Sequence, residues 1–186
     1  MGTRTISLAL VCLLLPVGAW ADRHRAGFGA APTYVSRSAL WGMQLSGDKP
    51  VWGEKTEGQP AHVGTLSLVA ELSLVAGDHE GATLAQFTFV AGPRFTFNHF
   101  NGNRRFQFFG QVLVGGAQVR MGEANSSWAG AFGVGVDIPL ESVARDDDHP
   151  WLALRVQYNE CWINTDSTDW YPQFSAGVVF RLNRHP

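Results

Sequence analysis

Apolar and polar residues alternate along the chain with a period of two, most regularly from residue 65 onward. In the first such run, Leu66, Leu68, Ala70, Leu72 and Leu74 alternate with Thr65, Ser67, Val69, Glu71 and Ser73. Successive side chains of a β-strand point to opposite faces, so this period predicts a strand with one apolar and one more polar face. No stretch has the pattern of an amphipathic helix. The pattern therefore predicts an all-β chain.

The same alternation predicts further strands downstream. They cover residues 86–97, 106–114, 128–138, 152–159 and 174–182, and Phe109 and Leu113 blur the alternation in the second of them. Turns or loops are predicted where Gly, Asn, Ser and charged residues gather, at 77–81, Asn101–Gly102, 122–127, 143–150 and 164–169. An Asn-Gly pair between two strand patterns is a strong signal for a hairpin.

The front of the chain is less regular. Residues 39–45 alternate well, whereas Pro32 interrupts the pattern of residues 28–35. Proline lacks the N–H that a strand ladder uses, and it is tolerated at sheet edges and strand starts. Residues 47–60 are rich in Gly, Pro and charge, and we expect them to form a loop.

The polar face of the alternation indicates which side of a barrel is inside. A soluble lipocalin-like barrel has an apolar lumen and a polar exterior, and an outer-membrane barrel reverses this. Here the polar face is made of Gly, Ala, Ser, Thr and Gln with a few isolated charges, namely Glu71, Arg94, Asp137, Arg155 and Arg181. Small residues suit the crowded interior of a narrow barrel, and charges of mixed sign suit lumenal ion pairs. We therefore expect these five charges in the lumen and the apolar face against lipid.

Composition and aromatic placement agree with a chain that has one face in lipid. Charged residues are 16% of the chain, below the roughly 25% of soluble domains. Trp128, Trp151, Trp162, Trp170 and Tyr171 lie at or near predicted strand ends, where the aromatic girdles of membrane barrels form. The formal net charge of −2 gives no electrostatic reason to expect a nucleic-acid partner.

Residues 1–21 have the features of an export signal, which leaves residues 22–186 as one predicted barrel domain. Arg4 supplies a positive start, residues 6–15 form a short apolar run, and residues 19–21 are a small-any-small cleavage site. The apolar run is too short to span a bilayer as a helix.

No cofactor or metal site is predicted. The six histidines fall in predicted loops or tails, and none is spaced with a second His or Cys as metal ligands are. Asp146, Asp147 and Asp148 are expected to be a solvated charge run, and Cys161, the one cysteine after the signal, leaves no disulfide partner. An enzyme in such a barrel would need a His beside a Ser near one rim, and His79 and Ser167 lie in separate predicted loops.

The last predicted strand resembles the C-terminal assembly signal of bacterial outer-membrane β-barrels. That pattern reads polar, any, Gly, any, any, hydrophobic, any, hydrophobic, and its four fixed positions are filled by Ser175, Gly177, Phe180 and Leu182. The resemblance implies the barrel-assembly machinery as a partner during biogenesis. Typical members end on an aromatic residue, whereas residues 183–186 follow Leu182 here.

Short motifs across residues 66–182 resemble the small bacterial outer-membrane β-barrel proteins with an OmpA-like transmembrane domain. They are Gly92-Pro93-Arg94-Phe95, the Gly-rich stretch 111–117, Gly133-Val134-Gly135-Val136-Asp137, Ala153-Leu154-Arg155 and residues 174–182. The resemblance implies an eight-stranded antiparallel up-and-down transmembrane β-barrel in the outer membrane of a Gram-negative-type bacterium, with no catalytic residues. Residues 47–60 do not match a short turn of the family, so the resemblance does not place the first two strands.

These observations together predict an integral outer-membrane barrel with a structural or surface-interaction role. We expect it to contact outer-membrane lipid, to have no enzymatic activity, and to form no general-porin pore, because the side chains fill a barrel of this size. Two alternatives stay open: an outer-membrane lipid-modifying barrel enzyme, and a soluble exported lipocalin-like carrier of an apolar ligand. The sequence names no surface ligand.

Overall fold

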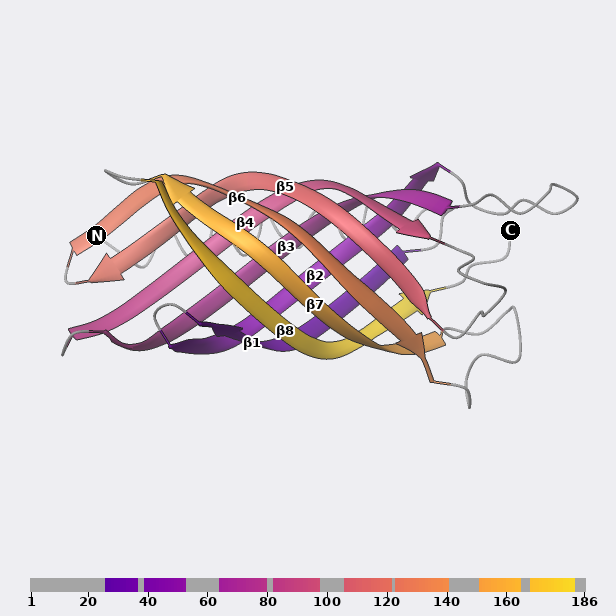
Figure 1. Ribbon diagram of the computed structural model, residues 1–186, viewed down its shortest axis with the longest axis horizontal. Coiled ribbons are helices and arrows are strands. Elements are labelled where there is room, and N and C mark those ends of the chain that lie inside the picture. Colours follow the sequence, from indigo (N-terminus) through magenta and orange to yellow (C-terminus); the bar gives the residue numbers. More distant parts are fainter. Residues whose placement is uncertain are drawn as a thin grey trace, which may run out of the picture.

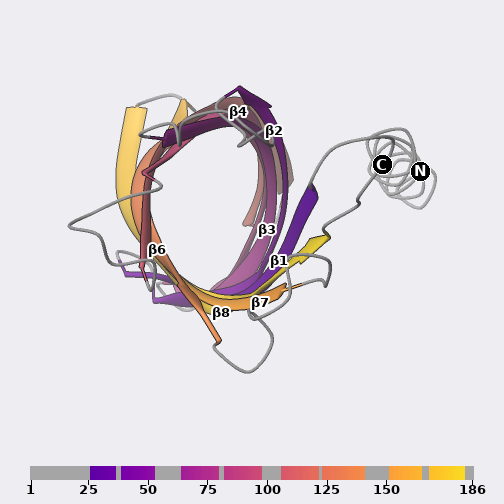
Figure 2. The same ribbon diagram turned by 90° about the vertical axis from the view of Figure 1, so that its right-hand side faces the viewer.

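The chain folds into a closed antiparallel barrel. The computed structural model describes residues 26–36, 39–52, 64–79, 82–97, 106–121, 123–140, 151–164 and 168–182. The strands are β1 (Ala26–Val35), β2 (Leu40–Trp52), β3 (Gly64–His79), β4 (Ala82–Phe97), β5 (Gln107–Met121), β6 (Glu123–Pro139), β7 (Trp151–Asn164) and β8 (Thr168–Leu182). Each strand pairs with the next, and β1 also pairs with β8 (Figure 1, Figure 2). The predicted eight-stranded up-and-down barrel is confirmed.

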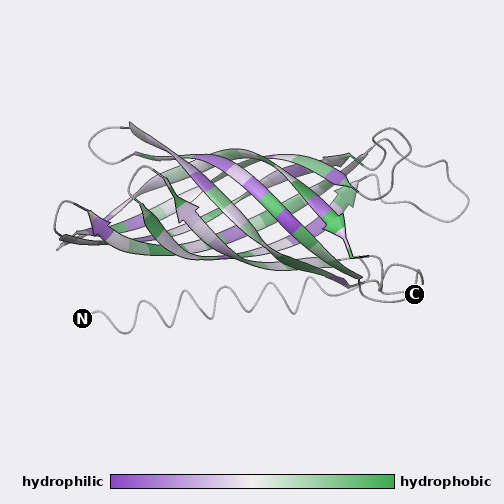
Figure 3. Ribbon diagram, turned by 60° about the horizontal axis from the view of Figure 1, so that its bottom comes forward, coloured by the Kyte–Doolittle hydropathy of each residue, from purple (hydrophilic) through white to green (hydrophobic). Residues whose placement is uncertain are grey.

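Side chains point outward or inward as the alternation predicts. Large apolar side chains face outward, and Val134 and Trp128 of β6 are 60% and 73% exposed. The lumen-facing Arg94 and Asp137 are 1% and 0% exposed. Hydrophobic and hydrophilic residues accordingly alternate along the ribbons in Figure 3. No helix in the described ranges is long and apolar enough to span a bilayer.

The prediction of a loop over residues 47–60 is wrong for its first part. β2 continues to Trp52 and pairs with β3 in regular register through Pro50, and a register shift follows between Pro50 and Trp52. Gly, Asp, Lys and Pro are rare in strands, so Gly47 to Pro50 look like loop residues in the sequence. Asp48, however, faces the lumen, which accepts charged side chains that have a partner as readily as a loop does.

A second correction concerns the predicted polar loop at 122–127, because β6 begins at Glu123 and pairs with β5 from there. Ser126 faces outward in this stretch, as Gln118 and Arg120 do on the paired end of β5, so this end of the hairpin has a polar outer face. The predictions for residues 1–21, Asn101–Gly102 and 143–150 lie outside the described residues.

The seam that closes the barrel is irregular at Pro32. Pro32 faces outward and pairs with Met43 of β2, but regular pairing of β1 with β8 is interrupted between Ala30 and Thr33. Gly177 of β8 lies against this gap, where a Cβ atom would approach the carbonyl oxygen of Ala30 to 2.1 Å. The two strands are thus in close contact at a point where regular ladder pairs are missing.

The two ends of the barrel have connections of different length. β1 begins and β8 ends at the same end, which we call the terminal end, and the opposite one is the turn end. The connections at the terminal end are residues 53–63, 98–106 and 140–150, whereas those at the turn end are 36–39, 80–81, 122 and 165–167.

The lumen is also divided along its length. Toward the turn end it is filled mainly by apolar side chains, which we call the apolar half: Val35, Leu40, Val75, Val90, Leu113, Ala117, Ala129, Ala131, Cys161, Ile163 and Tyr171. The buried polar Gln86, Thr88 and Gln173 lie between them, and Val69 of the same cluster lies at the level of Asp48. Toward the terminal end it is filled by a charged half, made of Asp48, Glu71, Arg94, Asp137, Arg155 and Arg181. Phe109, Gln111, Gln157 and Asn159 lie among these charges.

Candidate functional site: the charged half of the lumen

Glu71 of β3 is the centre of one hydrogen-bonded cluster. Arg94 of β4 donates from Nη2 to Glu71 Oε1 at 3.0 Å, and it also donates from Nε to Oε1 of Gln111 at 2.8 Å. Gln111 and Gln157 each donate from Nε2 to Glu71 Oε1 at 3.0 Å, and Asn159 donates to Glu71 Oε2 at 3.4 Å. Side chains of β3, β4, β5 and β7 are therefore held together across the lumen by one carboxylate.

Asp137 of β6 is the centre of a second cluster. Arg155 donates from Nε to Oδ1 and from Nη2 to Oδ2, both at 2.7 Å, so the guanidinium and the carboxylate meet side-on. Arg181 of β8 donates to Oδ2 at 2.9 Å. Bidentate arginine–carboxylate pairs of this kind are among the stronger hydrogen bonds in proteins.

Two residues that the sequence did not point to connect these clusters. Asp48 of β2 lies 3.8 Å from Nη1 of Arg94 and 3.9 Å from Nη2 of Arg155. The Phe109 ring lies between the same two arginines, with its centroid 4.3 Å from the Arg94 guanidinium carbon and 4.9 Å from that of Arg155. An aromatic face attracts cations, and here it separates two like charges.

The network has as many carboxylates as guanidinium groups, three of each. Five of its six residues are at most 6% exposed, so the charges stay buried because each has a partner of opposite sign. The five charges expected in the lumen, Glu71, Arg94, Asp137, Arg155 and Arg181, all lie there, and Asp48 is the sixth member.

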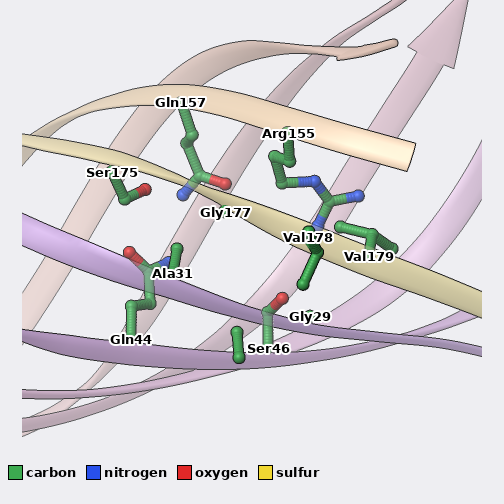
Figure 4. A pocket seen from close by; sticks show the side chains of 11 residues that line it. Gly29, Ala31, Gln44, Ser46, Arg155, Gln157, Ser175, Gly177, Val178 and Val179 are labelled. Carbon is green, nitrogen blue, oxygen red and sulfur yellow. The ribbon is translucent and has the colours of Figure 1, made fainter. Parts of the chain in front are cut away.

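The lumenal side chains leave little space. Two cavities between them each have a volume of about 10 Å³. One lies beside Arg155, Gln157 and Ser175 at the β1–β8 seam (Figure 4), and the other lies beside Glu71 and Cys161. A space of ~10–15 Å³ holds about one water molecule, so neither cavity is a channel or a ligand pocket.

The apolar half corrects one prediction about the aromatic residues. Tyr171, expected at the outer membrane interface, is 7% exposed and faces the lumen, where its hydroxyl oxygen accepts a 2.6 Å hydrogen bond from Nε2 of Gln86. Trp170 precedes it in β8 and faces outward, because neighbouring residues of a strand cannot share a face. Trp128 also faces outward, and the ring of Trp162 covers Gly130, where an added Cβ would lie 2.6 Å from the indole.

The remaining predicted sites divide between strands and undescribed residues. Ser175 faces the lumen, Phe180 is 53% exposed on the outside, and Gly177 contacts β1. Leu182 is the last residue of β8. His79 ends β3, and Ser167 lies outside the described residues. No group of three or more His, Cys, Asp and Glu side chains in the described ranges has a metal-binding arrangement.

Comparison with solved structures finds small barrels of the same fold, and the first of them supports the fold assignment. The chain is similar to Neisserial surface protein A, with a TM-score of 0.50 and 11% identity over 86% of this chain and 95% of that one. It is also similar to the outer membrane protein Ail of Yersinia pestis (TM-score 0.49, 12% identity, 86% and 100% covered). A third similar structure is OprG of Pseudomonas aeruginosa (0.47, 12%, 87% and 97%). No family model matches the chain, and no curated protein matches it.

Proposed function

We propose that this protein is an integral outer-membrane barrel of the OmpA-like kind, with a structural or surface-interaction role and no general-porin pore. The observation that carries the proposal is the inverted distribution of polarity. Phe132, Val134 and Val136 face outward on β6, whereas Asp137 of the same strand is fully buried in an ion-paired lumen. A barrel in water would leave such an apolar belt without a partner.

The same distribution argues against a soluble carrier of an apolar ligand. Such a carrier needs an apolar cavity of several hundred Å³. Here the middle of the lumen holds Glu71, Arg94 and Gln111, and the apolar half is packed with side chains. Within the described residues, ion-paired side chains cross one half of the lumen and packed apolar side chains fill the other, which supports the expectation that the barrel conducts no steady ion current.

A depth measurement tests the proposal directly. Val134 lies within the outward row from Trp128 to Ile138, and Gln118 faces outward near the turn end of β5. In a Cys161→Ser background, a fluorophore on Val134→Cys should be quenched by quenchers on lipid tails. The same fluorophore on Gln118→Cys should be quenched mainly by aqueous iodide. Iodide quenching at both positions would refute a membrane-spanning barrel.

A charge placed at the same two positions gives an energetic control. Val134→Arg should cost about 2–4 kcal/mol of unfolding free energy in lipid vesicles, because the charge enters hydrocarbon. Gln118→Arg should cost less than about 1 kcal/mol, since it replaces a polar residue outside the apolar belt. Fractionation of the expressed protein tests its expected location in the outer membrane, and heat-modifiable gel mobility tests whether the barrel is folded.

A further inference from the structure

One charged residue breaks the apolar belt on the outside of β6, β7 and β8. Outward positions run from Trp128 to Ile138 on β6, from Leu152 to Trp162 on β7 and from Trp170 to Phe180 on β8, and Glu160 is the one charged residue among them. Its neighbours in sequence, Asn159 and Cys161, face the lumen and are 2% and 5% exposed. Glu160 therefore points away from the charged half of the lumen.

Aromatic side chains surround this carboxylate. The strand register places the pair Trp162–Trp170 one row toward the turn end and the pair Tyr158–Phe174 one row toward the terminal end. Phe132 is the cross-strand neighbour of Glu160 on β6, and its ring lies 5.9 Å from that of Trp170. Rings of Tyr158 and Phe174 are 5.0 Å apart, centroid to centroid.

The carboxylate is only partly satisfied by the protein. Tyr158 donates its hydroxyl hydrogen to Oε2 of Glu160 at 2.5 Å, and no Arg, Lys or His in the described ranges forms a salt bridge with Glu160. A carboxylate has about four acceptor positions, so several stay available on the outer surface. A carboxylate without a cation beside this apolar surface is costly, and a cation from outside the barrel would offset that cost.

We propose that Glu160 and the surrounding rings form a docking site for the primary ammonium of a lipid headgroup. A carboxylate attracts the charge, ring faces stabilise it further, and a primary ammonium has N–H donors for the available acceptors. Lipid is the occupant because the site lies in the lipid-facing belt beside the Trp162–Trp170 pair, and tryptophans of such belts lie at headgroup level. This inference rests on the proposed membrane function.

Native mass spectrometry of the folded protein tests the site. The protein is equilibrated in micelles with equal amounts of phosphatidylethanolamine and phosphatidylcholine of identical acyl chains. We expect the wild type to retain the ethanolamine lipid about five- to tenfold better, the effect of one charged contact with aromatic support at an exposed site. Glu160→Gln should abolish this preference. Asp78→Asn, which removes an exposed outward carboxylate elsewhere, should leave the preference unchanged.

Equal retention of the two lipids by the wild type would overturn the inference without any variant. An unchanged preference in Glu160→Gln would overturn it as well. If Glu160→Gln instead alters the oligomeric state, the occupant is a second copy of the chain, and the lipid assignment is wrong. Failure of the wild type to enter bilayers would refute the proposed function itself, which separates the two failures.

Discussion

The two halves of the lumen fill the same barrel by different means. In the apolar half, Leu113 and Val75 are each 1% exposed and fill space by packing. In the charged half, Arg94 is equally buried, yet Glu71 and Asp48 must be placed to match it. Packing tolerates many apolar side chains of similar volume, whereas an ion pair tolerates the loss of neither partner. The charged half should therefore be the more sensitive to single substitutions.

The largest effect is expected at the centre of the second cluster. Asp137→Leu leaves Arg155 and Arg181 without their carboxylate in a buried site, which should cost about 3–5 kcal/mol of unfolding free energy. Urea unfolding of the barrel in lipid vesicles measures it. Asp78→Asn, at an exposed carboxylate, should change stability by less than about 0.5 kcal/mol. A cost below about 1 kcal/mol for Asp137→Leu would mean that the arginines find other partners.

A smaller cost is expected for a truncation in the apolar half. Leu113→Ala should lose about 3 kcal/mol in the same assay, because it removes buried methyl groups and leaves a cavity. The matched control is Leu68→Ala, whose side chain is 48% exposed on the outside, where lipid fills the space. If the two substitutions cost the same, the interior of the apolar half is not closely packed.

A still smaller effect is expected for the hydroxyl of Tyr171. Tyr171→Phe removes the hydrogen bond from Gln86 and should cost about 1 kcal/mol. In a Gln86→Met background the same substitution should cost less, because only the hydrogen bond with Thr88 is then left to lose. A full cost in both backgrounds would assign the effect to another contact of the ring.

The smallest effect is expected in ion conductance. Glu71→Ala combined with Arg94→Ala empties part of the charged half, yet planar bilayers should still record no large steady current, because the apolar half stays filled. Heat-modifiable mobility confirms that this double variant is folded. Steady open channels from it would show that the ion pairs alone close the lumen.

The sequence predicts the outer surface of the barrel well. Lipid demands an apolar side chain at nearly every outward position, so Leu66 to Leu74 and Phe132 to Ile138 carry an unbroken signal of period two. The residues of the inner surface follow no such pattern, because the lumen accepts Gly, Thr, Gln, Arg and Phe side chains alike.

The residues that the sequence analysis places wrongly all lie on the inner surface of the barrel. Asp48 looked like part of a loop, and Phe109 looked like a break in the alternation, although both lie on the lumenal face. An aromatic residue near a strand end, such as Tyr171, is expected on the outside. Trp170 faces outward, however, and the next residue of a strand must face the opposite way, so Tyr171 faces the lumen. The pairing of charges, such as Arg155 with Asp137, depends on the register between two strands. It therefore cannot be predicted from the sequence of either strand alone. The recognition role of Ser175, Gly177, Phe180 and Leu182 stays a prediction.

The irregular seam at Pro32 has a consequence for how the barrel opens. Every other strand pair is held by a longer ladder than β1–β8, and this ladder is interrupted between Ala30 and Thr33. Amide protons of the stretch of β8 that faces Pro32 should therefore exchange with deuterium before those of the β3–β4 ladder, which runs unbroken from Gly64 to His79. A slow pull on Ala26 and Leu182 would open the barrel along the same line, since these residues belong to the two strands that form the seam.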